Sequence, residues 1–107
     1  MAWLSSGRIL NPTLDLVLVD SGVITNPGPK NFQVFAASTV ASAFEIQWRD
    51  AANTATLKSQ IIAVPAFGSI SFYGFLREID MAINERIRVI QVAAVTGSVS
   101  VSLEMLT

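Results

Sequence analysis

Apolar and polar side chains alternate with a period of two along most of this 107-residue chain. In residues 44–49, Phe44, Ile46 and Trp48 share one face and polar side chains occupy the other. In residues 98–105, serines and a glutamate alternate with larger apolar side chains. Successive side chains of a strand point to opposite faces, so this period indicates β-strands with one face buried.

Turn residues separate the alternating segments. Clusters of Gly, Pro, Asn and Asp divide the chain into predicted strands at residues 14–19, 23–25, 32–37, 44–49, 54–64, 69–75, 86–93 and 98–105. Residues 76–84 leave two interpretations open, one or two helical turns or a loop that carries a short strand. Because no βαβ alternation is present, the pattern predicts an all-β fold, an antiparallel β-sandwich that is jelly-roll-like or immunoglobulin-like.

The first 13 residues differ from the rest, and we divide the chain into an N-terminal arm (1–13) and one sandwich domain (14–107). Ser, Gly, Asn and Pro interrupt the arm and argue against a regular helix or strand there. The arm either folds over its own sandwich or docks on a neighbouring subunit, with the tryptophan as anchor. Its apolar side chains are Trp3, Leu4, Ile9 and Leu10.

The chain is unusually apolar for its length. Hydrophobic residues make up 51% of it and charged residues only 14%, against about 25% charged in typical soluble domains. The longest uncharged stretch, residues 59–76, contains Gln60, Pro65 and Gly68, which predicts two strands and a turn instead of a membrane span. We therefore expect the apolar surplus to be buried against other subunits, with no membrane partner.

Composition also limits the chemistry. The chain has no cysteine and no histidine, which excludes thiol chemistry and removes the usual general base and metal ligand. Its acidic residues are scattered, Asp50 and Asn53 fit a turn, and isolated glycines form no phosphate-binding loop. The net charge of −1 gives no reason to expect nucleic-acid binding. We expect no catalytic residues, no cofactor and no metal site, and hence no enzyme.

Three further side chains are candidates for an interface. Trp48 shares a face with Phe44 and Ile46, which favours a core or interface position over a sugar-binding platform. Arg86 and Arg88 share one strand face and either grip an anionic partner or form a solvated face paired with Glu45 or Glu85. The solvated face is the favoured interpretation.

Four segments resemble small β-sandwich virion proteins of tailed bacteriophages, the decoration or cement proteins of the head. They are WRDAANTATL at 48–57, IAVPAFGS at 62–69, NERIRV at 84–89 and TGSVSVSL at 96–103. The resemblance implies homotrimers, or occasionally dimers, bound to the outer surface of the capsid. There they would clamp adjacent subunits of the major capsid protein, often through terminal arms.

Together these observations predict a structural virion protein at the capsid surface. Its partners would be copies of itself, with a trimer favoured, and the major capsid protein. The expected interface residues are Trp3, Leu4, Ile9, Leu10, Trp48, Arg86 and Arg88. The alternative is a small sandwich of the tail or adhesin type that recognises a glycan or a receptor through its end loops.

Overall fold

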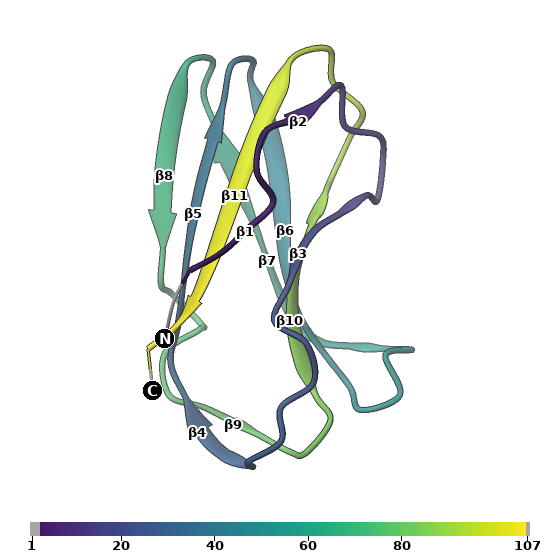
Figure 1. The fold of residues 1–107 in the computed structure, drawn as a ribbon, viewed down its shortest axis with the longest axis vertical. Coiled ribbons are helices and arrows are strands. Elements are labelled where there is room, and N and C mark those ends of the chain that lie inside the picture. The colour runs from purple at the N-terminus through teal and green to yellow at the C-terminus, as the bar shows by residue number, and fades with distance from the viewer. Residues whose placement is uncertain (1–2, 107) are drawn as a thin grey trace.

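A computed structural model describes residues 3–106, which form two antiparallel sheets that face each other, as Figure 1 shows. In the first sheet the strands follow the order β1-β11-β5-β8, and β2 also pairs with β11. These strands are β1 (Leu4–Ser5), β2 (Ile9–Leu10), β5 (Phe32–Ser38), β8 (Gly68–Phe72) and β11 (Ser98–Met105).

The second sheet has the order β3-β10-β6-β7, and a separate two-stranded sheet, β4-β9, closes one end of the molecule. These strands are β3 (Val17–Asp20), β4 (Gly28–Lys30), β6 (Ser42–Arg49), β7 (Thr56–Val64), β9 (Ile79–Met81) and β10 (Arg86–Gln91). The described residues form strands and turns without a helix. The predicted all-β sandwich is therefore confirmed.

The core lies between the two sheets. Phe44 and Ile46 of β6 meet Val34 of β5 and Val101 of β11 there, and all four side chains are fully buried. The intervening residues of the same strands point outward because strand side chains alternate. Burying such apolar side chains is the main stabilising contribution in a sandwich without disulfides.

The strand predicted at residues 14–19 begins later than expected. β3 starts at Val17, and Asp15 adopts a positive φ of 63° in the turn before it. Leu18 is buried, but Leu14 and Leu16 are exposed, so these three alternating leucines do not share one buried face. The turn replaces the strand because the backbone at Asp15 cannot continue an extended ladder at that φ.

β4 and β9 form a strand pair; the sequence did not predict β4, and it left the strand in residues 76–84 as one of two interpretations. Pro29 of β4 lies opposite the exposed Asp80 of β9. Ile79 and Met81, on either side of Asp80, are buried. Of the two interpretations of residues 76–84, the short strand is confirmed and the helical turns are wrong.

The N-terminal arm, as far as it is described, lies on its own sandwich. Leu4 pairs with Leu103, and Ile9 pairs with Val99, so two short strands form where none was expected. Between them the N–H of Ser6 donates to the carbonyl of Val101 at 2.8 Å. The serines and glycine confine the pairing to two residues at a time. Residues 1 and 2 lie outside the described part.

Candidate interaction surfaces

The four arm residues expected at an interface divide into two kinds. Leu4 and Ile9 are partly buried and pack against the hydrophobic core of their own chain. Trp3 and Leu10 remain exposed, with 43% and 63% of their surface open to solvent. The arm therefore has an inner pair that fixes it to β11 and an outer pair that is available to another molecule.

The exposed apolar side chains continue beyond the arm. Twelve large apolar residues of the described chain are exposed, and five of them lie within residues 3–17. We call these five the N-terminal apolar surface: Trp3, Leu10, Leu14, Leu16 and Val17. In Figure 1, β1 lies along the lower half of β11 and β2 lies near its upper end, so this set is distributed along the molecule.

Backbone hydrogen bonds hold this segment in place. The N–H of Asn11 donates to the carbonyl of Gly97 at 2.7 Å, and its side-chain oxygen accepts the N–H of Gly97 at 3.0 Å. Further along, the N–H of Asp15 donates to the carbonyl of Gln91, and the N–H of Gln91 donates to the carbonyl of Leu16, both at 2.9 Å. The exposed leucines are thus presented on a fixed backbone.

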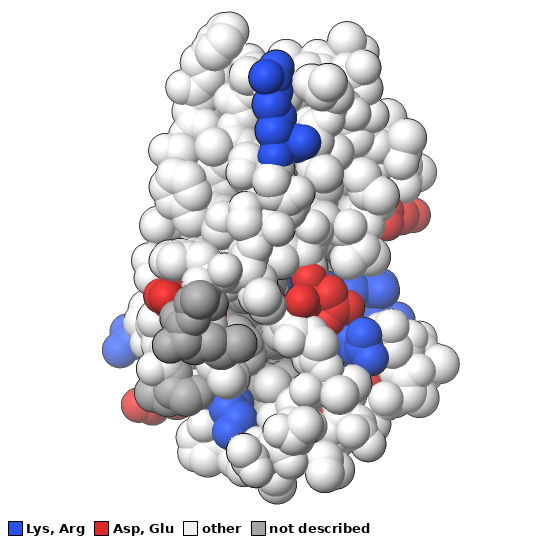
Figure 2. All heavy atoms as spheres, in the orientation of Figure 1, with Lys and Arg blue, Asp and Glu red and all other residues white. Residues whose placement is uncertain are grey.

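Charged side chains are sparse on the face that Figure 2 shows. They gather in its lower half and leave most of the upper half uncharged. On the outer side of the first sheet, strand register aligns Ser5, Ser102, Phe35 and Ser71 in one row across four strands. Phe35 is 41% exposed in this row. The aligned row itself is therefore uncharged and consists of three serines and a phenylalanine.

Trp48 lies on the inner side of β6, packed against the core. Its indole N–H donates to the carboxylate of Glu85 at 3.1 Å, and the same oxygen accepts the N–H of Ala82 at 2.8 Å. Of the two positions predicted for Trp48, the structure shows the core position.

Arg86 and Arg88 lie on the outer side of β10. Nη1 of Arg86 forms an ion pair with Asp20 at 3.2 Å, and Nε of Arg88 donates to Oε1 of Gln47 at 2.6 Å. The face of Arg86 and Arg88 was predicted to pair with Glu45 or Glu85; the charge of Glu45 acts on Arg88, but the ion pair of Arg86 is with a different carboxylate. Asp20 takes that place because β3 pairs with β10 and lies beside these arginines.

The environment of Arg88 shows how crowded this face is. Partial burial lowers the pKa of the Arg88 guanidinium, and the nearby charge of Arg49 lowers it further, while Asp20 acts in the opposite direction. Arginine stays protonated nonetheless. Because Arg86 and Arg88 are held by side chains of their own sheet, this face suits a solvated network better than the capture of an anion.

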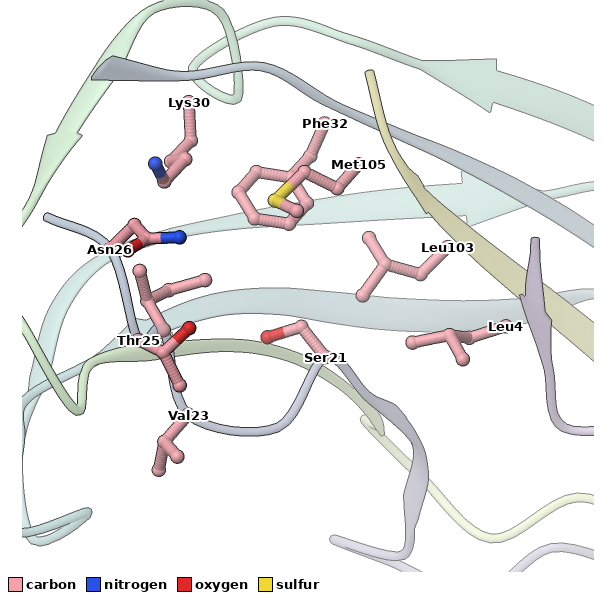
Figure 3. Close-up of a pocket in the computed structure, with 10 residues that line it drawn as sticks. Leu4, Ser21, Val23, Thr25, Asn26, Lys30, Phe32, Leu103 and Met105 are labelled. Carbon is pink, nitrogen blue, oxygen red and sulfur yellow. The ribbon is translucent and has the colours of Figure 1, made fainter. Parts of the chain in front are cut away.

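A cavity of about 150 Å³ opens between the arm and the segment that joins β3 to β4, as Figure 3 shows. Leu4, Phe32, Leu103 and Met105 form its apolar wall, and Lys30 supplies a cation. The cavity holds no acid–base pair, and the described residues contain no group of three or more potential metal ligands. Its size suits one apolar side chain of a partner.

Sequence reasoning missed the most exposed aromatic side chain of residues 3–106. Phe67, in the turn between β7 and β8, is 88% exposed and has a φ of 54°. A bulky residue rarely adopts this left-handed conformation. Beside it lies an open hollow of about 300 Å³ that is also lined by Arg8, Thr39 and Ser100. The only sequence signal was the Pro–Ala–Phe–Gly turn itself, which does not specify exposure.

Within residues 3–106, no helix is long and apolar enough to cross a membrane. No protein-family model matches the chain, and no curated protein shows significant similarity to it. The fold and the surfaces described above are therefore the basis for the function.

Proposed function

We propose that this β-sandwich is a structural protein that binds other protein subunits and has no catalytic role. Specifically, it would be a decoration subunit that binds the major capsid protein lattice of a tailed-phage head and stabilises the shell. One observation carries the proposal: twelve large apolar side chains are exposed among residues 3–106 of a chain with only 14% charged residues. The phage head is the setting that the sequence resemblance implies.

Single exposed apolar residues are normal in soluble proteins, so their arrangement matters more than their number. The N-terminal apolar surface concentrates five of them in fifteen consecutive residues, 3–17, on a backbone held by hydrogen bonds. A partner that covers this segment gains about 25 cal/mol per Å² of apolar surface buried, before the entropy lost on association. Little ordering of the segment would be needed, because it is already fixed.

The test uses point variants, because deleting the arm would also remove Leu4 and Ile9 from the core. Trp3→Ser and Leu10→Ser change exposed side chains and should leave the fold intact. We expect the double variant to lose at least tenfold in affinity for shells assembled from the major capsid protein alone. Co-sedimentation with such shells measures this.

Ile83→Ser is the matched control, because Ile83 is 54% exposed but lies outside residues 3–17. Its affinity for the shells should equal that of the unchanged protein. If the unchanged protein does not bind the shells, the decoration role is wrong. If the double variant binds as well as the control, the arm is not the contact.

A second candidate function has one specific observation in its favour. Phe67 presents an aromatic ring at a loop tip beside an open hollow, which is how small sandwiches often contact a glycan or a receptor. In this case Phe67→Ala would abolish binding on a glycan array or to host-cell surfaces. A protein that shows no binding in either assay would exclude the candidate.

A further inference from the structure

β7 is an edge strand whose outer side is unpaired in the described structure. It spans nine residues, pairs with β6 alone, and has exposed side chains from Thr56 to Ile61. Proteins usually keep edge strands short or protect them with charges, proline or bulges, since open edges recruit other strands. Here the longest strand of the molecule lies at an edge, with Lys58 as its only charge.

Hydrogen bonds define which backbone groups of β7 face outward. The carbonyl of Ala43 accepts the N–H of Val92. The backbone N–H and carbonyl groups of odd-numbered β6 residues therefore point toward β10, and those of even-numbered residues point toward β7. Through the register Ile46↔Gln60, the even-numbered residues of β7 bond to β6. The N–H and carbonyl groups of Ser59, Ile61 and Ala63 therefore face the open edge.

An independent contact supports this assignment. The side-chain amide of Gln60 donates to the carbonyl of Ile61 at 3.0 Å, which is a local substitute for a strand partner. Such a bond is easily exchanged for a bond to an incoming strand because both groups are exposed.

The side chains of this edge are arranged symmetrically about Ser59. Leu57 and Ile61 stand two residues away on either side and are 50% and 53% exposed. Lys58 and Gln60 are the polar residues between them. The Lys58 ammonium lies 5.3 Å from the centroid of the Phe75 ring, so it is drawn to the core side of the strand.

We infer that two copies of this chain join β7 to β7 in antiparallel fashion, with a twofold axis at Ser59. In this register Leu57 meets Ile61 of the second copy, on both sides of a Ser59–Ser59 pair. Lys58 faces the neutral Gln60, so the two lysines do not oppose each other. The four-stranded sheet becomes a continuous eight-stranded sheet across the dimer.

The occupant is a second copy because the strand is complementary to itself. An antiparallel pair of identical strands has twofold symmetry, the commonest symmetry of soluble oligomers. In the alternative register, with the twofold axis at Gln60, Ile61 of one copy would lie opposite Ser59 of the other. That register would place an apolar side chain opposite a polar one. The inference is independent of the proposed decoration role, and a dimer is the less common of the two oligomers that the phage resemblance implies.

Disulfide trapping tests the register directly, since the chain has no cysteine. Hydrogen-bonded antiparallel partners have Cα atoms about 5.5 Å apart, within the range that a disulfide bridges. We expect Ser59→Cys to form a covalent dimer in most of the protein under mild oxidation. Ser71→Cys, on the outer side of β8, is the control and should remain monomeric on a non-reducing gel.

Gln60→Cys distinguishes the alternative register. Efficient trapping by Gln60→Cys with none by Ser59→Cys would overturn the axis at Ser59. Absence of trapping by both variants would overturn the β7 pairing altogether.

Solution mass measures the association without a cross-link. The unchanged protein should sediment at twice its mass of 11.5 kDa. Ser59→Pro removes an outward N–H and should leave the β6 ladder intact. Ile61→Lys adds a charge at the edge. We expect both variants to weaken the dimer at least a hundredfold, and Leu14→Lys, at a residue 60% exposed elsewhere, to leave it unchanged.

These outcomes separate the inference from the proposed function. A monomer, or a trimer that both β7 variants preserve, contradicts the β7 dimer. A β7 dimer that fails to bind capsid shells contradicts only the decoration role. If Ser59→Pro does not fold, as judged by circular dichroism, Ile61→Lys and the cysteine variants still decide the question.

Discussion

At the scale of single residues, Asp50 organises the turn between β6 and β7. Its carboxylate accepts the N–H of Thr54 at 2.8 Å, the N–H of Ala55 at 3.3 Å and the hydroxyl of Thr54 at 3.2 Å. The bond from the Thr54 N–H, followed by that from Ala55, holds the pKa of Asp50 below its ordinary value. The ionised form is therefore favoured by the folded chain.

This shift predicts how stability depends on pH. A carboxyl with a lowered folded-state pKa contributes its full stability above the unfolded-state pKa, about 3.9, and loses it as pH falls through the folded-state value. The melting temperature of Asp50→Ala should thus lie furthest below that of the unchanged protein above about pH 5. The difference should narrow as pH falls below about 3.9 and through the lowered folded-state pKa of Asp50.

Thermal unfolding followed by circular dichroism across this range measures both curves. Asp50→Asn is the matched control, because it keeps an oxygen acceptor but does not titrate. A gap between Asp50→Ala and the unchanged protein that is constant with pH would show that the carboxylate charge has no role in the turn.

Phe67 provides a second prediction at this scale. Its left-handed φ of 54° is strained for phenylalanine, while its 88% exposure means that little packing would be lost on substitution. We expect Phe67→Gly to raise the free energy of unfolding by about 1 kcal/mol, measured by urea denaturation. A loss of stability would show that the ring packs on the hollow beside it.

At the scale of elements, the arm contains a matched pair of leucines. Leu4 packs against the core, whereas Leu10 is 63% exposed. Leu4→Ala should lower the free energy of unfolding by about 1–2 kcal/mol, because it removes partly buried apolar surface. Leu10→Ala should change it by no more than about 0.5 kcal/mol. Equal effects in denaturant titrations would mean that the arm does not dock as described.

The elements also show what sequence alone can predict. β6 and β11 were found because their alternation is complete and one face of each is buried. β4 and the two strands of the arm were not, and β9 was only one of two interpretations, because each consists of two or three residues whose pairing partner lies far along the chain. Short pairings of this kind carry no local period.

The candidate surfaces followed the same rule. Trp3 and Leu10 could be proposed as interface residues from composition. That Leu4 and Ile9 pack against the core instead could not be predicted, because it depends on which side of β11 each residue faces. The partner of Arg86 was mistaken because Asp20 lies 66 positions away and becomes its neighbour only through the β3–β10 register.

At the scale of the whole molecule, the balance of apolar and charged surface predicts how association responds to salt. The β7 edge has Lys58 as its only charge, and the net charge of the chain is −1. Two copies therefore repel each other little, and few charge pairs form between them. Sodium chloride therefore has few charge–charge interactions to screen at this interface.

We expect the dimer dissociation constant to change less than threefold between 0.05 and about 0.5 M sodium chloride, where ion screening changes most. Sodium sulfate should tighten the dimer, because it is excluded from apolar surface and favours its burial. Sedimentation equilibrium in the two salts measures both effects, with Ile61→Lys as the control that lacks the apolar contact. Steep weakening by sodium chloride would instead indicate an interface held by charges, such as the Asp20–Arg86 face of the second sheet.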